Sequence, residues 1–383
     1  MTIQTPKILV VDDEPDLELL IRQKFRKEIK EGRYNFEFAN NGVNALEKIN
    51  ADNQIELVLT DINMPEMDGL TLLSKIKEMN NPLLHSVIVS AYGDIFNIRT
   101  AMNGGAFDFV IKPIDLKDLE ITITKALDNL ETFKKALRSR DELIAVRKEL
   151  EEARALQLSM LPESIPQTND LEIAVYMDTA SEVGGDYYDF SIKKDGSLNI
   201  AIGDATGHGM KAGIMVSIMK ALFISDSVDI DINEFFESSN HTIKSLQLGR
   251  MMMAFAMLNY KENQIRFINS GMPPLMIFNN SSKKVEEISI NNMPLGAMRS
   301  AEYEVKELNV NKGDSILLLS DGLPEMQNVS GEMFGYGRIK ELFETNISKS
   351  PEEIISILKS EGSHWSNRID HDDDVTFVII RIK

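Results

Sequence analysis

Chemically useful side chains stand at the ends of short apolar runs in the first third of the chain. They are Asp12, Asp13, Asp61, Ser90 and Lys112. If the runs are parallel strands, their carboxyl ends meet at one edge of a sheet and these side chains converge there. Neighbouring carboxylates repel one another unless a cation joins them, and Mg²⁺ prefers oxygen ligands. With the ammonium of Lys112 and the hydroxyl of Ser90 beside it, one carboxylate could accept a phosphoryl group, and Asp61 is the central candidate.

A second set of aspartates stands at turns and run ends in the C-terminal half. The positions are Asp186 in VGGDYY, Asp204 in AIGDATG, Asp321 in LLSDG, and Asp373 and Asp374 in HDDDVTF. No histidine pair accompanies them, and oxygen-only ligands favour Mg²⁺ or Mn²⁺ over zinc. Acids from several strand ends can bridge two ions, which activate water for phosphoester hydrolysis. His208 in the turn TGHG is interpreted as a packing residue at a helix start, not as a catalytic group.

The elements that must position the first set follow from an alternating pattern between Lys7 and about Leu116. Short apolar runs such as KILVV, NFEFA and ELVLT alternate with amphipathic stretches such as PDLELLIRQKF. The runs predict strands and the amphipathic stretches predict helices. Five such units predict a doubly wound α/β domain, with a five-stranded parallel sheet covered on both faces.

A long helix is predicted next, because residues 115–160 contain neither Gly nor Pro. Alternating three- and four-residue spacing predicts a coiled-coil seam and a homodimer through it. The seam positions are Ile123, Ala126, Leu130, Phe133, Leu137 and Ile144, then, in a register shifted at Arg140, Leu143, Val146, Leu150, Ala153, Gln157 and Met160. The alternative is a single surface helix that packs on its own domains.

Beyond Pro162 and Pro166 the pattern changes, and strand-like runs follow one another with turn residues between them. Helical stretches interrupt the runs near 208–226, 232–248, 336–346 and 351–361. This order predicts an α+β domain, an antiparallel β-sandwich flanked by helices.

Composition excludes several classes of protein. The 41 Lys and Arg against 60 Asp and Glu give a net charge of −19, which argues against nucleic acid as a partner. The chain has no Cys, so it has no disulfide or thiolate metal site and a reducing compartment, the cytoplasm, is expected. No leader or membrane-spanning segment is expected, because no sufficiently long apolar stretch occurs.

The first set of motifs, VVDDEP, LTDINMPEMDG, VSAYGD and VIKPID, resembles the receiver domain of two-component response regulators over about 120 residues. The resemblance implies that Asp61 accepts phosphate from a histidine kinase or phosphotransfer protein. It implies that Asp12, Asp13, Asp61 and the carbonyl of Asn63 hold Mg²⁺. It also implies that Ser90 and Phe109 form the switch pair, with Lys112 aimed at the phosphate by a cis bond to Pro113.

The second set resembles the metal-dependent serine/threonine phosphatase family (PPM), in its SpoIIE/RsbU branch, and the signature ALQLSMLPESIP precedes it. The resemblance implies that Asp186 and Asp204 bridge two Mn²⁺ or Mg²⁺ ions, which Asp321, Asp373 and the carbonyl of Ala205 complete. Asp374 takes the neighbouring position. Family substrates are phosphoserine or phosphothreonine proteins, often STAS-domain anti-sigma factor antagonists. One departure, Asn-Ser-Gly-Met at 269–272 where relatives commonly read Asn-Ala-Gly-His, concerns substrate contacts and leaves the metal set intact.

These interpretations divide the chain into a receiver at 1–122, a coiled-coil linker at 123–160 and a phosphatase at 161–383. The leading hypothesis is a response regulator whose phosphorylation controls a phosphatase. The alternative is a catalytically silent adaptor that sequesters a partner, which the intact set of aspartates disfavours. A DNA-binding output is disfavoured because the C-terminal half is acidic and rich in strands.

Overall fold

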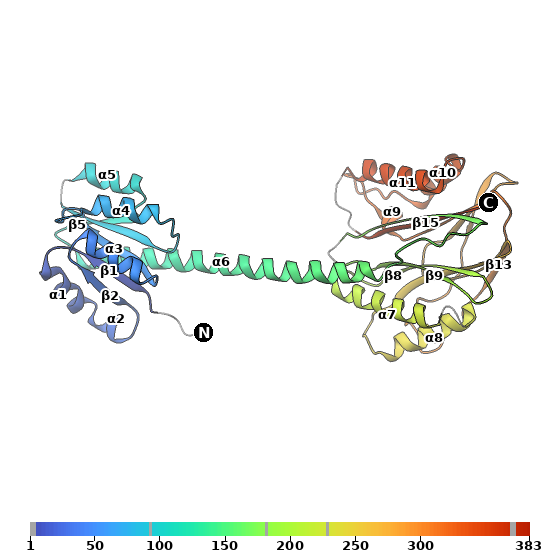
Figure 1. Ribbon diagram of the computed structural model, residues 1–383, viewed down its shortest axis with the longest axis horizontal. Coiled ribbons are helices and arrows are strands. Elements are labelled where there is room, and N and C mark those ends of the chain that lie inside the picture. Colours follow the sequence, from blue (N-terminus) through green and yellow to red (C-terminus); the bar gives the residue numbers. More distant parts are fainter. Residues whose placement is uncertain (1–4, 92–93, 181–182, 227–229, 368–372) are drawn as a thin grey trace. The chain divides into compact units, whose positions relative to one another are not determined.

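Figure 1 shows the computed structural model of the chain, which describes residues 5–91, 94–180, 183–226, 230–367 and 373–383. The chain forms two compact units, Met1–Ala145 and Val146–Lys383. Helix α6 (Leu116–Ser159) contributes residues to both units. Each unit is described separately below.

The N-terminal unit contains a five-stranded parallel sheet with the order β2-β1-β3-β4-β5. Its strands are β1 (Lys7–Val11), β2 (Asn35–Ala39), β3 (Ile55–Asp61), β4 (His85–Ala91) and β5 (Asp108–Lys112). Strands β1, β3 and β4 are almost wholly buried, as expected for a parallel sheet covered on both faces. The predicted doubly wound sheet is therefore confirmed.

Helices cover both faces of this sheet. They are α1 (Pro15–Lys24), α2 (Arg26–Lys30), α3 (Gly42–Ala51), α4 (Gly69–Glu78) and α5 (Ile95–Gly104), with the first turns of α6. One core joins α1 and α6 to the sheet and another joins α3 and α4 to its other face. Side chains begin two of these helices, because Asn41 accepts from the N–H of Asn44 and Asp68 accepts from that of Thr71.

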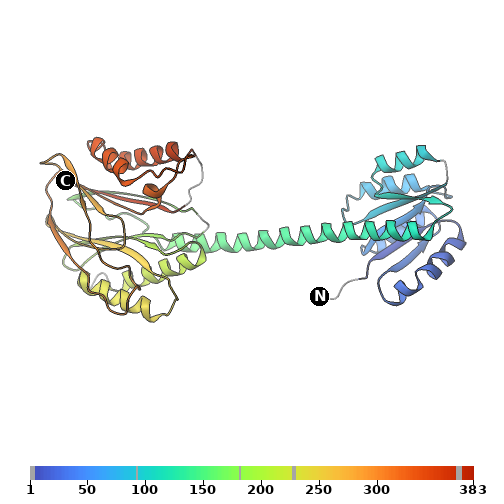
Figure 2. The ribbon, with the colours of Figure 1, turned by 180° about the vertical axis from the view of Figure 1, so that it is seen from behind.

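Helix α6 is one continuous helix, close to the predicted bounds (Figures 1 and 2). Ile123, Ala126 and Leu130 are fully buried, the first two in the core of the N-terminal unit, and Gln157 is buried in the C-terminal unit. The predicted seam is therefore wrong at both ends, because the chain itself covers these positions. Residues 138–149 are exposed, and dimerisation through this stretch remains a prediction.

The C-terminal unit contains two antiparallel sheets, with the orders β13-β10-β9-β8-β7 and β12-β11-β14-β15-β6. The first sheet consists of β7 (Asp186–Ile192), β8 (Leu198–Ala205), β9 (Met253–Lys261), β10 (Gln264–Ser270) and β13 (Lys306–Asn309). The second consists of β6 (Leu171–Asp178), β11 (Leu275–Asn279), β12 (Lys284–Ile288), β14 (Ser315–Leu319) and β15 (Val375–Ile382).

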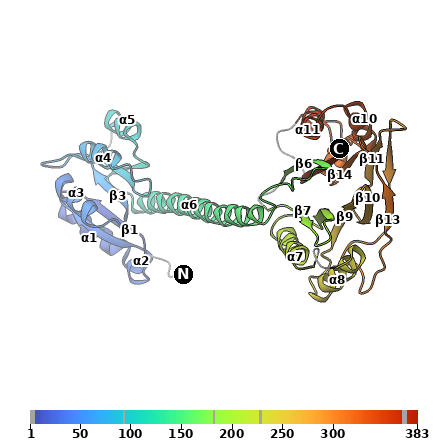
Figure 3. The same cartoon turned by 45° about the vertical axis from the view of Figure 1, so that its right-hand side comes forward.

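The two sheets face each other across an apolar core, and helices cover their outer faces (Figures 1 and 3). The helices are α7 (Met210–Asp226) and α8 (Ile232–Ser245) on the first sheet, and α9 (Gly322–Glu325), α10 (Tyr336–Thr345) and α11 (Pro351–Ser366) on the side of the second. This confirms the predicted sandwich flanked by helices. Among the described residues, no helix combines the length and apolar character needed to cross a membrane.

Candidate metal centres

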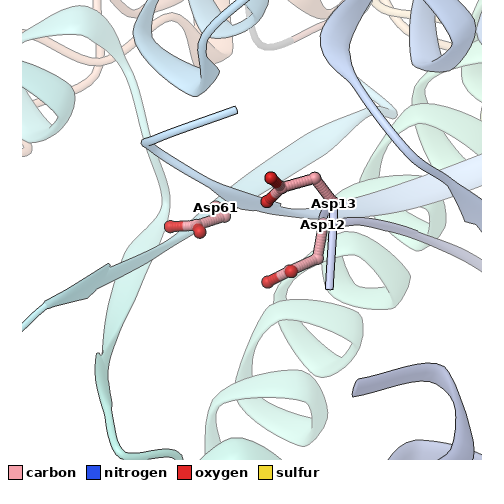
Figure 4. Close-up of side chains that lie close together, drawn as sticks. All are labelled: Asp12, Asp13 and Asp61. Atoms are coloured by element: carbon pink, nitrogen blue, oxygen red, sulfur yellow. The ribbon is translucent and has the colours of Figure 1, made fainter. Parts of the chain in front are cut away.

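Three carboxylates gather at the carboxyl edge of the parallel sheet. Asp12 and Asp13 directly follow β1, and Asp61 is the last residue of the neighbouring strand β3. One carboxylate oxygen from each lies within 4.8 Å of the others, and Figure 4 shows the three side chains side by side. Asp61 is 7% exposed, and its Oδ1 accepts from the N–H of Ile62 at 2.7 Å. The arrangement suits a hard cation with oxygen ligands.

Lys112 completes this edge from the end of β5. Its Nζ lies 2.8 Å from Oδ2 of Asp61 and 2.9 Å from Oδ2 of Asp12. Burial alone would lower the pKa of Lys112, but the hydrogen bonds to Asp61 and Asp12 outweigh it and raise this pKa well above its usual range. The ammonium is therefore a fixed positive charge beside Asp61. The predicted cis bond between Lys112 and Pro113 is present.

The other residues predicted for this edge differ in their surroundings. Ser90 is fully buried in β4, one residue past the partner of Asp61, and its Oγ has no hydrogen-bond partner among the described residues. Such a hydroxyl can serve an incoming phosphoryl oxygen. Phe109 packs half-buried beside Ile88, whereas Asn63 is exposed two residues after Asp61.

Four aspartates of the second set lie at strand ends and turns of the C-terminal unit. Asp186 begins β7 and lies directly opposite Asp204 of β8. Asp321 precedes α9, and Asp373 lies two residues before β15. Burial raises the pKa of Asp204 to about 7, and the charges of Asp321 and Asp373 add to the shift. Burial and then the charge of Asp204 likewise raise the pKa of Asp186. Raised pKa values of this kind are typical of carboxylates that are buried close to one another.

This group is wider than the first. Among the described residues, only Asp12, Asp13 and Asp61 bring three acidic oxygens within 4.8 Å of one another. A centre for two ions needs a wider spread of ligands, because the ions stand about 3.5–4 Å apart. The four aspartates of the second set do not come as close to one another as the first three, and their role as ligands of two ions stays a prediction. The carbonyl of Ala205 lies in the same region, one residue after Asp204 on β8.

Two hydroxyl groups that the sequence did not single out orient Asp186. Ser320 Oγ and Thr376 Oγ1 donate to Asp186 Oδ2 at 2.7 and 2.6 Å. Ser320 in turn accepts from the N–H of Thr376 at 2.9 Å. The paired hydroxyls fix the orientation of a carboxylate that is 1% exposed. The sequence gave only a weak signal for the role of Ser320 and Thr376, because a hydroxyl residue close to an aspartate is common.

The carboxylate of Asp374 binds backbone groups of the loop before β7. Its carboxylate accepts from the N–H groups of Ala180, Gly185 and Asp186. A Cβ added at Gly184 would lie 2.8 Å from Oδ2 of Asp374. The glycine pair before Asp186 is therefore needed for close approach, and Asp374 holds the loop that carries Asp186.

His208, interpreted from the sequence as a packing residue at a helix start, is exposed on the turn that precedes α7. Partial burial raises the pKa of Asp373, and the charge of His208 opposes this shift.

Comparison with known families matches both halves of the chain. Residues 8–124 match the family described as response regulator receiver domain, and residues 194–383 match the family described as stage II sporulation protein E (SpoIIE). Both motif sets of the sequence lie in these stretches, except Asp186, which lies just before the second.

Individual relatives divide in the same way. The phosphoserine phosphatase RsbU of Bacillus subtilis is 25% identical over 62% of this chain and 71% of its own length. The protein IcfG of Synechocystis is 23% identical over 61% of this chain, but only 42% of its own length is covered. The transcriptional regulatory protein ZraR of Escherichia coli is 37% identical over 33% of this chain and 27% of its own length.

Solved structures support the fold of the C-terminal half. The SiaA-PP2C domain of Pseudomonas aeruginosa has a TM-score of 0.56 and 17% identity, and covers 63% of this chain and 99% of its own. The RsbU and RsbW domains of Rv1364c from Mycobacterium tuberculosis have a TM-score of 0.50 and 22% identity, over 58% of this chain and 63% of that one.

Proposed function

Because this chain joins a response regulator receiver domain to a SpoIIE-family domain, we propose that it is a response regulator whose output is the dephosphorylation of a protein. The observation that carries the proposal is that one chain holds the cluster of Asp12, Asp13 and Asp61 in the first fold and the opposed pair of Asp186 and Asp204 in the second. The C-terminal domain is a metal-dependent serine/threonine phosphatase.

In the receiver, Asp61 is the phosphoacceptor. One of its oxygens attacks the phosphorus of a phosphohistidine on a partner kinase or phosphotransfer protein, and the bond from phosphorus to the imidazole nitrogen breaks. Lys112, 2.8 Å from Asp61, and the unpaired hydroxyl of Ser90 hold the oxygens of the incoming group. Asp12, Asp13 and the carbonyl of Asn63 would hold Mg²⁺ with Asp61, and Mg²⁺ when bound supplies charge neutralisation. Phe109 and Ser90 form the switch pair.

In the phosphatase, the donor set is made of oxygens from Asp186, Asp204, Asp321, Asp373 and the carbonyl of Ala205. Two Mn²⁺ or Mg²⁺ ions, when bound there, supply Lewis acidity toward water and the phosphoester. The hydroxyls of Ser320 and Thr376 keep Asp186 oriented, and Asp374 holds its backbone.

The substrate is a phosphoserine or phosphothreonine protein, and we place it among STAS-type anti-sigma factor antagonists. The likeness to a relative named a phosphoserine phosphatase supports a phosphoserine protein as the substrate. The functional boundaries are a receiver at 1–122, a helical linker at 123–160 and a phosphatase at 161–383. The working form is a homodimer through the linker.

The test is hydrolysis of p-nitrophenyl phosphate and of a phosphoserine STAS protein in Mn²⁺. Rates are compared with and without beryllofluoride, which stands in for a phosphoryl group on Asp61. The variants are wild type, Asp204→Asn and Asp61→Asn. We expect turnover that Asp204→Asn abolishes, and a beryllofluoride effect that Asp61→Asn removes.

The outcomes separate the alternatives. Turnover that ignores beryllofluoride leaves the enzyme but removes its control by the receiver. Hydrolysis of p-nitrophenyl phosphate without hydrolysis of the STAS protein removes the proposed substrate class. No turnover of either compound moves the chain to the class of silent adaptors.

A further inference from the structure

A cavity lined by basic side chains opens at the C-terminal end of helix α8. Its volume is about 720 Å³, and His241, Lys244 and Arg299 line it. No Asp or Glu of the described residues lines it, although acidic residues outnumber basic ones by 60 to 41 in the whole chain. Lys244 and Arg299 also form no ion pair with a carboxylate in the part of the chain that the structure describes. The positive charge of this basic cavity is therefore available to a ligand.

Helix α8 holds in place the wall of the cavity that carries Arg299. Asn240, one turn before Lys244, donates to a carbonyl of the loop 296–299 at 3.1 Å and accepts from one of its N–H groups at 2.9 Å. Lys244 Nζ donates to the carbonyl of Ala297 in the same loop at 2.9 Å. An ammonium can donate several hydrogen bonds, so this one fixes Lys244 at the cavity and leaves the others for a ligand. The basic cavity is therefore built from elements that are bonded to one another.

The basic cavity lies at the end of the first sheet of the C-terminal unit that carries Asp204. Met253 of β9 pairs with Ala205, the residue after Asp204, and on its other side with Leu295. Leu295 leads directly into the loop 296–299. Neighbouring strands are about 4.8 Å apart, so Leu295 stands roughly 10 Å from Ala205. An extended chain advances about 3.3 Å per residue, so a side chain about three to five residues from a phosphoserine at Asp204 can reach the cavity.

We propose that the basic cavity binds an acidic segment of the phosphoprotein substrate, and that it selects substrates with Asp or Glu about three to five residues from the phosphorylated residue. The inference deepens the proposed function and rests on it, because it places the reacting phosphoester at Asp204. The guanidinium of Arg299 can bind one carboxylate through a pair of N–H groups, and the ammonium of Lys244 can bind a second. Both side chains lie away from the reacting phosphoester, so the cavity acts on the choice of substrate and not on the chemical step.

The experiment compares phosphoserine peptides as substrates of the full-length chain in Mn²⁺. One peptide of each pair carries Glu residues about three to five positions from the phosphoserine, and the other carries Gln at the same positions. One pair has these residues before the phosphoserine and a second pair has them after it. We expect wild type to hydrolyse the Glu peptide of one pair with a kcat/KM about 5- to 30-fold above that of its Gln partner, the range given by two ion pairs at a partly exposed site. Lys244→Gln combined with Arg299→Gln should remove this preference.

The chain offers a matched control in Lys283 and Lys312, which are both exposed. Lys283 lies in the turn between β11 and β12, and Lys312 lies in the turn before β14, whereas Asp321 lies beyond the other end of that strand. Lys283→Gln combined with Lys312→Gln removes the same charge from the chain and should keep the preference for the Glu peptide. Equal losses of preference in the two double variants would show an effect of net charge and overturn the proposal. Equal kcat/KM values for the Glu and Gln peptides in wild type would overturn it as well.

Substitutions of Arg299 alone keep the test decisive if the change at Lys244 disturbs the loop. Arg299 is exposed, and its side chain forms no hydrogen bond with the described residues. We expect the kcat/KM for the Glu peptide to fall in the order wild type, Arg299→Gln, Arg299→Glu, and that for the Gln peptide to follow no such order. Similar declines for both peptides would overturn the proposal. Failure to hydrolyse any peptide or p-nitrophenyl phosphate refutes the proposed function and the inference with it, whereas equal hydrolysis of all peptides refutes the inference alone.

Discussion

At the residue scale, Ser320 and Thr376 direct the carboxylate of Asp186. Both donate to the same oxygen, Oδ2, in a site that is 1% exposed. Groups that orient metal ligands usually change metal affinity or activity by about 10–100-fold when removed. We expect Ser320→Ala to lower Mn²⁺ affinity by about 10-fold while the fold persists, as measured by titrating activity and by direct ion binding.

A buried serine without such a contact provides the control. Ser239 is 0% exposed, and its Oγ has no hydrogen-bond partner among the described residues. Ser239→Ala should leave the Mn²⁺ dependence unchanged. If both substitutions shift it alike, the effect reflects general loosening of the domain and not the orientation of Asp186.

The raised pKa values of the clustered acids make the stability of the metal-free domain depend on pH. Burial and neighbouring charges raise the pKa of Asp204 to about 7. The folded state therefore holds a proton that the unfolded state has already lost between about pH 4 and 7, so stability falls as pH rises through this window. With chelator present, we expect the unfolding temperature to fall by about 5 °C between about pH 5 and 7.5.

The fluorescence of Trp365, the single tryptophan, reports this domain during unfolding. Asp204→Asn should flatten the pH dependence, because it removes the titrating group. Mn²⁺ should restore stability, and more so at the higher pH, because it competes with protons for the same oxygens. A metal-free domain that grows more stable toward pH 7.5 would contradict the mutual suppression of ionisation.

Local sequence signals predict the aspartates as site residues but do not point to the hydroxyl groups that orient Asp186. Asp61 and Asp321 stand at the ends of apolar or nearly apolar runs, and Asp186 follows a glycine pair. These local features are enough to single out the three residues. Ser320 and Thr376 lie 134 and 190 residues from Asp186 along the chain. The pairing of β14 with β15 brings the two hydroxyls together, and the packing of their sheet against the sheet that holds β7 brings them to Asp186. Neither a register between distant strands nor a contact between sheets can be read from local pattern.

At the element scale, helix α6 shows both the strength and the limit of periodicity. The absence of Gly and Pro predicted one continuous helix, and Leu116–Ser159 is one helix. The same three- and four-residue spacing of apolar residues occurs in a helix face that packs on its own domain and in one that packs on a second copy of the chain. Ile123 and Gln157 therefore looked alike in the sequence, although the chain buries the first in one unit and the second in the other.

The uncovered middle of α6 allows a direct test of dimerisation. Leu143, Ile144 and Val146 are 70%, 60% and 53% exposed, which is an unusual run of apolar side chains for solvent. We expect the wild-type chain to have the mass of a dimer in light scattering. Leu137→Arg places a charge in the seam and should give the mass of one chain. Ser139→Arg adds the same charge outside the seam and should stay dimeric, and an unchanged dimer in Leu137→Arg would reject the coiled coil.

At the scale of the whole molecule, the division into two fold classes was predictable. The pattern changes from alternating strands and helices to successive strands after the helix, which matches a parallel sheet in one unit and antiparallel sheets in the other. What the pattern could not supply is which contacts hold the two ends of α6, because each end packs in a different unit.

If α6 carries the signal by its rotational position, the response depends on helical phase and not on length. Residues 138–149 are exposed, so insertions after Ser139 disturb neither packed end. Seven inserted residues return a coiled-coil stripe to nearly the same direction, whereas two rotate everything beyond them by about 200°. We expect the seven-residue insertion to keep the effect of beryllofluoride on hydrolysis of p-nitrophenyl phosphate, and the two-residue insertion to abolish or invert it. Ala-Glu sequences suit both insertions, because they preserve the helix. Equal responses from both insertions would show that the linker acts as a tether, and control by Asp61 would then have to pass through direct contact between the domains.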